Sequence, residues 1–174
     1  SVRVTTLPAN GTLLLADGVT AVSAGQVRAP PQASTLVYRP AADFSGSASI
    51  AFTVTDDLGA VSSPGVFAIT VIAVNDYPVA LADSASTNGA TPVTVAVLAN
   101  DSDVDGDTLT VAGASVNAAL GSVTIDSNGS LTFTAAPGVS GVVPISYSVS
   151  DGHGGTASST LSVDDAPGVT SGGS

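Results

Sequence analysis

The strongest constraint on the fold of this chain is an internal repeat with a spacing of 95 residues. The segment Phe52–Asp56 (FTVTD) recurs as Tyr147–Asp151 (YSVSD), and Leu36–Tyr38 recurs as Leu131–Phe133 at the same spacing. The first copy carries an insertion near residues 16–34. Because separate blocks keep both their order and their distance, the sequence predicts two copies of one structural unit.

The residue composition and the spacing of turn residues favour an all-β protein. The sequence contains no Glu, Lys or Met, three residues that favour helices, while Val, Thr, Ser and Gly are abundant. In the second copy, alternating apolar and small polar residues are separated by turn segments such as 126–129 and 152–155. The predicted strands span residues 79–87, 92–98, 108–116, 121–126, 130–135, 143–150 and 156–163. Seven such strands predict a β-sandwich.

The first copy begins late in this pattern. Its predicted strands span residues 2–7, 12–15, 36–39, 47–55 and 67–74, which match the last five strands of the second copy. The strands at 79–87 and 92–98, termed A and B, have no counterpart there. Five strands leave open sheet edges, which favour pairing with another chain. Three explanations stay open: the sequence is an excerpt that cuts a module, another chain supplies the strands, or five strands fold alone.

The repeat and the composition together divide the chain into four segments. We expect a partial sandwich at 1–74, a linker at 75–78, a complete sandwich at 79–164 and a flexible tail rich in Gly and Ser at 165–174.

Four aspartates alternate with other residues in one predicted loop of the second copy: Asp101, Asp103, Asp105 and Asp107. The formal net charge is -11, and the basic residues are only three Arg and one His. Two carboxylates about 4 Å apart repel by about 4 kcal/mol at an effective dielectric of 20. Alternating Asp with a Gly, here Gly106, is how a short loop wraps oxygen ligands around Ca²⁺. The sequence therefore predicts a calcium site, with a solvated acidic turn as the alternative.

Further candidate ligands are expected at the same end of the second copy. In a seven-strand sandwich, the loops at 99–108 and 151–155 lie at the end where the linker enters. Asp151 and the linker residues Asn75 and Asp76 should therefore lie near the aspartate loop. Capping of local turns is the alternative role for these three side chains.

Two more aspartates complete the set of candidate calcium ligands. Asp83 lies in the first predicted strand of the second copy. Asp43 lies in a loop of the first copy that is expected to face the boundary between the copies.

The linker Asn75-Asp76-Tyr77-Pro78, the aspartate loop and Asp151 together resemble the calcium-binding elements of cadherin-like repeats. The chain is most similar to the tandem cadherin-like repeats of large bacterial surface adhesins, including adhesins of the repeats-in-toxin type. This resemblance implies two tandem Ig/cadherin-like Greek-key sandwiches, the first lacking strands A and B. It also implies bound Ca²⁺ that stiffens an extended rod at the bacterial cell surface, with a role in cell adhesion or a biofilm matrix. The chain has no Glu, which animal cadherins also use as ligands.

The charge and the residue types exclude several other functions. A sequence pI near 4.1 argues against binding nucleic acid, and no apolar run is long enough to insert into a membrane. With no Cys or Lys and a lone His153 at a predicted hairpin tip, no nucleophile and base are assembled, so we expect no enzyme activity. The expected partners are neighbouring modules or like subunits. The alternative function is a self-assembling extracellular filament, in which a neighbouring chain completes the first sandwich; a carbohydrate- or ice-binding module is a third hypothesis.

Overall fold

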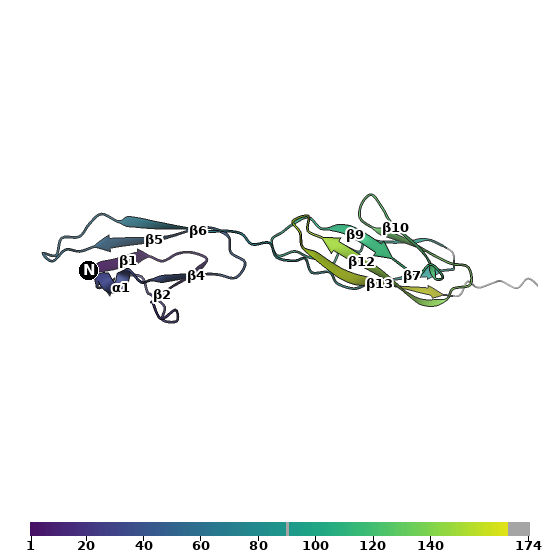
Figure 1. Cartoon of the computed structure of the whole chain (residues 1–174), viewed down its shortest axis with the longest axis horizontal. Coiled ribbons are helices and arrows are strands. Elements are labelled where there is room, and N and C mark those ends of the chain that lie inside the picture. Colours follow the sequence, from purple (N-terminus) through teal and green to yellow (C-terminus); the bar gives the residue numbers. More distant parts are fainter. Residues whose placement is uncertain (90, 167–174) are drawn as a thin grey trace, which may run out of the picture. The chain divides into compact units, whose positions relative to one another are not determined.

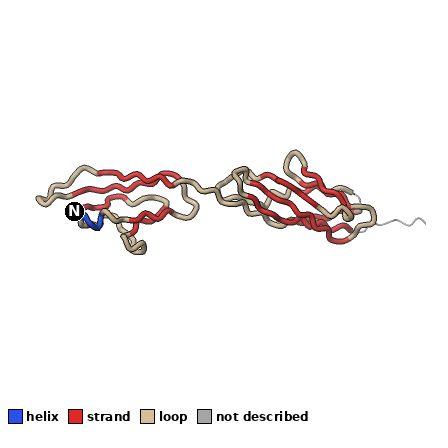
Figure 2. The backbone as a smooth tube through the Cα atoms, in the orientation of Figure 1, coloured by secondary structure: helices blue, strands red, loops and turns tan. Residues whose placement is uncertain are grey.

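The computed structural model describes residues 1–89 and 91–166, apart from the side chain of Pro31. The chain divides into two units, Ser1–Val74 and Asn75–Ser174 (Figure 1). Strands dominate both units, and the one helix in the described residues, α1 (Pro30–Ala33), has four residues (Figure 2). In this described part, no helix is long and apolar enough to cross a membrane. The predicted all-β fold is confirmed.

The second unit is a sandwich of two sheets. Its strands are β7 (Asp83–Asn88), β8 (Val93–Val95), β9 (Thr110–Ser115), β10 (Gly121–Ile125), β11 (Leu131–Ala135), β12 (Gly141–Ser150) and β13 (Thr156–Ala166). The larger sheet has the order β7-β13-β12-β9, and the smaller one has the order β10-β11-β8. β7 runs parallel to β13, while the other neighbouring strands are antiparallel. The seven predicted strands are all present, in the predicted order.

Alternation along these strands creates the core of the second unit. Side chains two residues apart point to the same face of a strand, and the inward positions of β11, β12 and β13 are mostly apolar. The apolar residues of these strands that are exposed by 2% or less are Leu131, Phe133, Val143, Ile145, Tyr147, Val149, Leu161 and Val163. The Phe133 ring also packs on the backbone of Gly121, where a Cβ atom would lie 2.7 Å from the ring. This close approach requires a residue without a side chain.

The last strand of the second unit runs further than predicted. β13 continues to Ala166, so Asp165 belongs to the sandwich and not to the tail predicted from residue 165. Asp165 pairs with Gly141 across the ladder, and its side chain is 1% exposed, with the backbone N–H of Gly89 donating to Oδ1 at 2.8 Å. The sequence indicated a loop here because Asp165 is acidic and precedes a Gly-rich segment. It does not show that Asp165 pairs with Gly141 and accepts the N–H of Gly89. The rest of the predicted tail, 167–174, lies outside the described residues.

The first unit repeats the second with one side open. Its strands are β1 (Val2–Thr6), β2 (Gly11–Leu14), β3 (Val27–Arg28), β4 (Val37–Pro40), β5 (Gly46–Val54) and β6 (Gly65–Val71). One sheet has the order β3-β1-β5-β6, and β2 pairs with β4 in the other. The insertion supplies α1 and β3, and β3 adds to the edge of β1. Neither element was predicted, because the insertion lacks a clear alternating pattern.

The strand register shows which positions of the two units are equivalent. Ile50 pairs with Phe67 in the first unit, as Ile145 pairs with Leu161 in the second. The ring of Tyr38 packs on Gly11 as that of Phe133 packs on Gly121. β6 is thus the counterpart of β13 and β4 is the counterpart of β11, but among the described residues neither has a neighbour in place of β7 or β8. The five strands predicted for the first copy are therefore present in residues 1–74, as β1, β2, β4, β5 and β6.

Candidate metal centre

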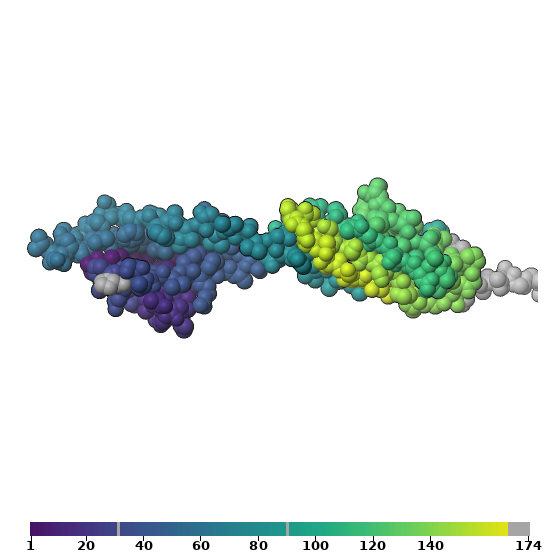
Figure 3. Space-filling view, viewed as in Figure 1, coloured from purple at the N-terminus to yellow at the C-terminus, as the bar shows by residue number. Residues whose placement is uncertain are grey.

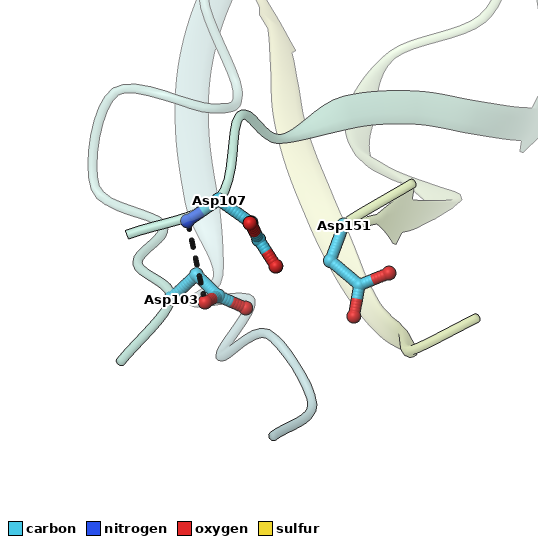
Figure 4. Close-up of side chains that lie close together, drawn as sticks. All are labelled: Asp103, Asp107 and Asp151. Atoms are coloured by element: carbon cyan, nitrogen blue, oxygen red, sulfur yellow. Dashed lines mark hydrogen bonds between the residues drawn. The ribbon is translucent and has the colours of Figure 1, made fainter. Parts of the chain in front are cut away.

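Three carboxylates from two loops meet at one end of the second unit. Asp103 and Asp107 lie in the loop between β8 and β9, and Asp151 begins the loop between β12 and β13. One oxygen of each carboxylate lies within 4.8 Å of an oxygen of the other two. Figure 4 shows the three side chains gathered around one space. The structure therefore brings together three of the predicted ligands, from segments more than 40 residues apart in sequence.

The aspartate loop is shaped by hydrogen bonds to one of its own side chains. Oδ1 of Asp103 accepts the backbone N–H group of Asp105 at 2.9 Å. It also accepts that of Asp107 at 3.4 Å, the dashed line in Figure 4. Gly106 has a φ of +80°, which lets the loop turn back at that point. Oδ2 of Asp103 is buried and has no hydrogen-bond partner within the protein. A buried carboxylate oxygen without a partner is costly unless a cation or another donor satisfies it.

Asp151 is held firmly in its ionised form. Its side chain is 2% exposed, and Oδ1 accepts the backbone N–H groups of His153, at 2.7 Å, and Gly155, at 2.9 Å. The side-chain amide of Asn75 donates to Oδ2 at 2.8 Å. The Asn75 hydrogen bond is the largest cause that lowers the pKa of Asp151, and the two backbone donors add to it against the opposing effect of burial.

The same turn occurs in the first unit without the other carboxylates. Asp56 is the counterpart of Asp151 in the repeat, and its Oδ1 accepts the backbone N–H groups of Leu58 at 2.9 Å and Ala60 at 2.8 Å. Turn capping therefore explains an aspartate at this position in both units. Of these two aspartates, only Asp151 belongs to a three-carboxylate group among the described residues.

Replacing Asn75 by Ala is expected to raise the pKa of Asp151 toward that of a free aspartate. A carboxylate whose pKa is lowered in the folded state stabilises the fold above its unfolded pKa of about 3.9, and this contribution is lost as the pH falls through the folded value. With calcium chelated, Asn75→Ala should therefore shift the acid unfolding of the second unit to higher pH. Carbon-detected NMR titration of the Asp151 carboxyl and melting curves between pH 2 and 5 measure both effects. Asn128→Ala, in the turn between β10 and β11, is the control; an unchanged Asp151 titration in Asn75→Ala would contradict the prediction.

Asp83 and Asp101 form a second, separate pair of acidic residues. Oδ1 of Asp101 accepts the backbone N–H of Leu81 at 2.8 Å, and Oδ2 is buried without a partner within the protein. Burial is the main cause that raises the pKa of Asp101, and the nearby charge of Asp83 adds to it. The Tyr147 hydroxyl lies 2.8 Å from both Oδ2 of Asp83 and the carbonyl oxygen of Leu81, either of which can accept its proton. Burial, and then the hydrogen bond to Asp83, raise the pKa of Tyr147.

The remaining candidate ligands lie outside the three-carboxylate group. Oδ2 of Asp105 accepts the backbone N–H of Asp76 at 2.7 Å. This hydrogen bond attaches the entering segment, residues 75–78 at the start of the second unit, to the aspartate loop. Asp43 belongs to the first unit, where it lies between β4 and β5 with a φ of +58°. The calcium-ligand roles of all the predicted residues stay predictions: Asp43, Asn75, Asp76, Asp83, Asp101, Asp103, Asp105, Asp107 and Asp151.

The structure also places two side chains in this region that were not predicted to contact the candidate ligands. Nδ1 of His153 lies 2.9 Å from Oδ2 of Asp107, and the imidazole is otherwise well exposed. His153 is indeed in a turn, as predicted, but its ring faces the aspartate loop. The hydroxyl of Tyr147, a residue of the repeated segment 147–151, reaches Asp83. The sequence placed the turn of His153 and the aspartate loop at the same end of the sandwich, and this was the available indication that His153 could contact an aspartate.

The donor atoms of this centre suit a hard cation. Carboxylates offer only oxygen acceptors, and Ca²⁺ takes six to eight oxygen ligands from carboxylates, carbonyls and water. Asp103, Asp107 and Asp151 supply the carboxylates, and the unpartnered Oδ2 of Asp103 is free to bind such an ion. The residues present therefore fit a calcium ion.

The sequence model of the bacterial Ig domain family matches the chain twice, over residues 2–70 and 75–164. Each match falls within one structural unit. The match is not specific to cadherin-like or repeats-in-toxin repeats. The narrower resemblance to those repeats therefore stays a prediction. Among curated proteins, none is significantly similar to the chain in sequence.

Several solved structures share a distant likeness with the chain. A nucleoside hydrolase-related hypothetical protein from Saccharophagus degradans is 18% identical, with a TM-score of 0.42 over 53% of this chain and 26% of that chain. An endo-fucoidan hydrolase from glycoside hydrolase family 107 is 17% identical, with a TM-score of 0.39 over 97% and 24%. Domains 4 and 5 of the S-layer protein SbsC are 15% identical, with a TM-score of 0.34 over 94% and 98%. This chain spans about a quarter of the length of the first two proteins, and likenesses this weak carry no argument about function.

Proposed function

Because the chain belongs to the bacterial Ig domain family in both of its units, we propose that it is a calcium-stabilised structural repeat of an extracellular bacterial protein. The observation that carries this proposal is the meeting of Asp103, Asp107 and Asp151, with an unpartnered buried oxygen on Asp103. Bacterial Ig domains are typically non-catalytic modules, in agreement with the predicted absence of enzyme activity.

The electrostatics of the second unit support a bound cation. Like charges about 4 Å apart repel by about 4 kcal/mol at an effective dielectric of 20, so three clustered carboxylates oppose folding unless a counterion is present. His153, beside Asp107, is the one basic side chain paired with an acidic group in the described residues. Extracellular calcium modules bind with dissociation constants of about 10⁻⁴–10⁻³ M, which a centre with few protein ligands can reach.

Calcium would act on the segment that enters the second unit. The side chain of Asn75 and the backbone N–H of Asp76 already donate hydrogen bonds to Asp151 and Asp105. An ion held by Asp103, Asp107 and Asp151 would fix Asp151 directly and would fix Asp105 through the loop that it shares with Asp103 and Asp107. Both acceptors would then immobilise the entering segment. We propose that tandem modules are stiffened into a rod in this way, in a protein of the cell surface or biofilm matrix that serves in adhesion.

A second candidate function is a subunit of a self-assembling extracellular filament. It is favoured by the open edges of β4 and β6 in the first unit, which could pair with strands of a neighbouring chain. In this case calcium would stabilise the second unit of each subunit.

Isothermal titration of the full chain with CaCl₂ tests the proposed calcium site. We expect saturable binding, and we expect Asp103→Asn combined with Asp107→Asn to weaken it at least tenfold. Asn keeps the Oδ1 acceptor that shapes the loop while removing two negative charges, so the fold should persist.

Asp56→Asn is the matched control for this titration. It alters the equivalent turn aspartate of the first unit, which belongs to no three-carboxylate group among the described residues, and should leave calcium affinity within twofold of the wild type. Equal calcium binding by the double variant and the wild type would disprove the proposed site.

A further inference from the structure

The turn that begins at Asp151 carries a histidine, whereas the equivalent turn of the first unit carries a leucine. His153 corresponds to Leu58 at the repeat spacing of 95 residues. The backbone N–H of Leu58 donates to Asp56 at 2.9 Å, as the backbone N–H of His153 donates to Asp151 at 2.7 Å. The Leu58 side chain is 95% exposed, so it contributes little to the fold. The turn therefore forms with either side chain and does not require an imidazole.

The imidazole of His153 lies at the surface, beside the three-carboxylate group. The turn that carries His153 precedes β13, the strand that forms the yellow surface of the second unit in Figure 3. Nδ1 of His153 lies 2.9 Å from Oδ2 of Asp107, a member of the three-carboxylate group. The His153 side chain is 64% exposed, so the ring can turn about its own side-chain bonds without displacing buried atoms.

A nitrogen ligand changes which metal ions this centre suits. Ca²⁺ takes oxygen ligands, whereas an imidazole nitrogen suits first-row transition metals such as Zn²⁺, which also binds carboxylate oxygens. Two ligand atoms that are each about 2.1 Å from one zinc ion lie about 3.0–3.4 Å apart. Nδ1 of His153 and Oδ2 of Asp107, at 2.9 Å, are already close to this separation. Both atoms can therefore reach one ion with little movement.

We propose that His153 is a ligand for a divalent transition-metal ion such as Zn²⁺, which competes with calcium for the three-carboxylate group. This inference rests on the proposed function, because both ions use the same carboxylates. Zn²⁺ needs about four ligands, which the imidazole and the carboxylates supply, whereas Ca²⁺ needs six to eight and takes further oxygens. The residue at position 153 then sets the metal preference of the module.

Two variants of His153 separate metal ligation from a contact with Asp107. His153→Leu introduces the residue that the first unit carries in the same turn, and His153→Asn keeps a side-chain N–H that can donate to Asp107. Even residues that only contact a metal ligand typically change metal affinity by about 10–100-fold. Loss of a direct ligand should therefore weaken zinc binding at least about tenfold in both variants. His153→Asn should change calcium affinity less than about threefold, because Ca²⁺ takes oxygen ligands.

Isothermal titrations of the full chain with ZnCl₂ and, separately, with CaCl₂ measure these affinities, and NMR identifies the ligand atom. The sequence contains a single His, so the imidazole signals need no assignment. With ZnCl₂, one ring nitrogen of His153 should take the ¹⁵N chemical shift of a metal-bound imidazole, and CaCl₂ should leave both ring nitrogens unliganded. Asp103→Asn combined with Asp107→Asn should lose the zinc signal, and Asp56→Asn should keep it.

The outcomes for zinc and for calcium are distinguishable. Zinc affinity that falls no more than calcium affinity in both His153 variants would overturn the inference and leave the calcium site in place. Ring nitrogens that do not respond to saturating ZnCl₂ would overturn it equally. Zinc binding through His153 without any calcium binding would support the inference and contradict the proposed calcium function. Melting curves verify that both variants fold, as the turn of Leu58 leads us to expect.

Discussion

Removal of calcium is expected to lower the unfolding midpoint of the second unit by roughly 10–20 °C, starting from a concentration 100 times the Kd. At that excess, binding to the folded state adds about 2.7 kcal/mol of stability. A domain of 60–100 residues gains about 4–8 °C for each kcal/mol. The effect arises because chelation leaves Asp103, Asp107 and Asp151 close together without a counterion.

Calorimetry of the full chain in calcium and in chelator measures this shift. NMR signals of Tyr147 and Phe133 identify the transition that belongs to the second unit. Asp103→Asn with Asp107→Asn should abolish the calcium-dependent shift and should leave the midpoint in chelator unchanged or higher, since it relieves repulsion. Asp56→Asn should retain the shift. A double variant that is destabilised equally in both buffers would assign these aspartates a purely structural role.

Truncating equivalent core residues is expected to have very different effects in the two units. Leu161→Ala should destabilise the second unit by about 2–5 kcal/mol, because it removes a fully buried side chain and leaves a cavity. Phe67→Ala, at the same position of the first unit, should cost less than about 1 kcal/mol, because its ring is 60% exposed and surface substitutions have small effects.

Urea titrations followed by residue-resolved NMR separate the stabilities of the two units. Leu161→Ala should shift the signals of β11 to β13 to a lower midpoint, and Phe67→Ala should hardly move those of β5 and β6. Phe52→Ala is an internal comparison, since the Phe52 ring packs on Gly65 and is less exposed than Phe67. Equal losses at Phe67 and Leu161 would mean that the Phe67 side chain is as well buried in solution as that of Leu161, which would contradict the prediction.

The strands of the second unit could be predicted from the sequence because one simple pattern fixes them. Inward apolar residues alternate along 143–150, and turns such as 126–129 separate the strands, so β12 and β10 were predicted within two residues of their bounds. The element β3, two residues long, has no such pattern. It forms because the edge of β1 offers a backbone to pair with, which depends on tertiary structure.

The candidate centre could be predicted as a region but not as a set of contacts. The loop positions placed Asp103, Asp107 and Asp151 at one end of the sandwich. It was not predictable which aspartates of the loop join the three-carboxylate group and which do not, because this depends on the direction of each side chain. Asp101 turns toward Leu81, and Asp103 turns into its own loop. The contact between His153 and Asp107 likewise depends on the path of two turns in space.

The shared turn of Asp56 and Asp151 has a consequence for how such arrays vary. Each aspartate accepts the N–H groups two and four residues later, so local folding alone is sufficient reason to keep it in every module. A module therefore retains one aspartate that could serve as a metal ligand, whether or not the module binds metal. Under the proposed function, sensitivity to calcium would be gained or lost by altering the single neighbouring loop that carries Asp103 and Asp107, which would allow stiff and compliant joints to alternate along one polypeptide.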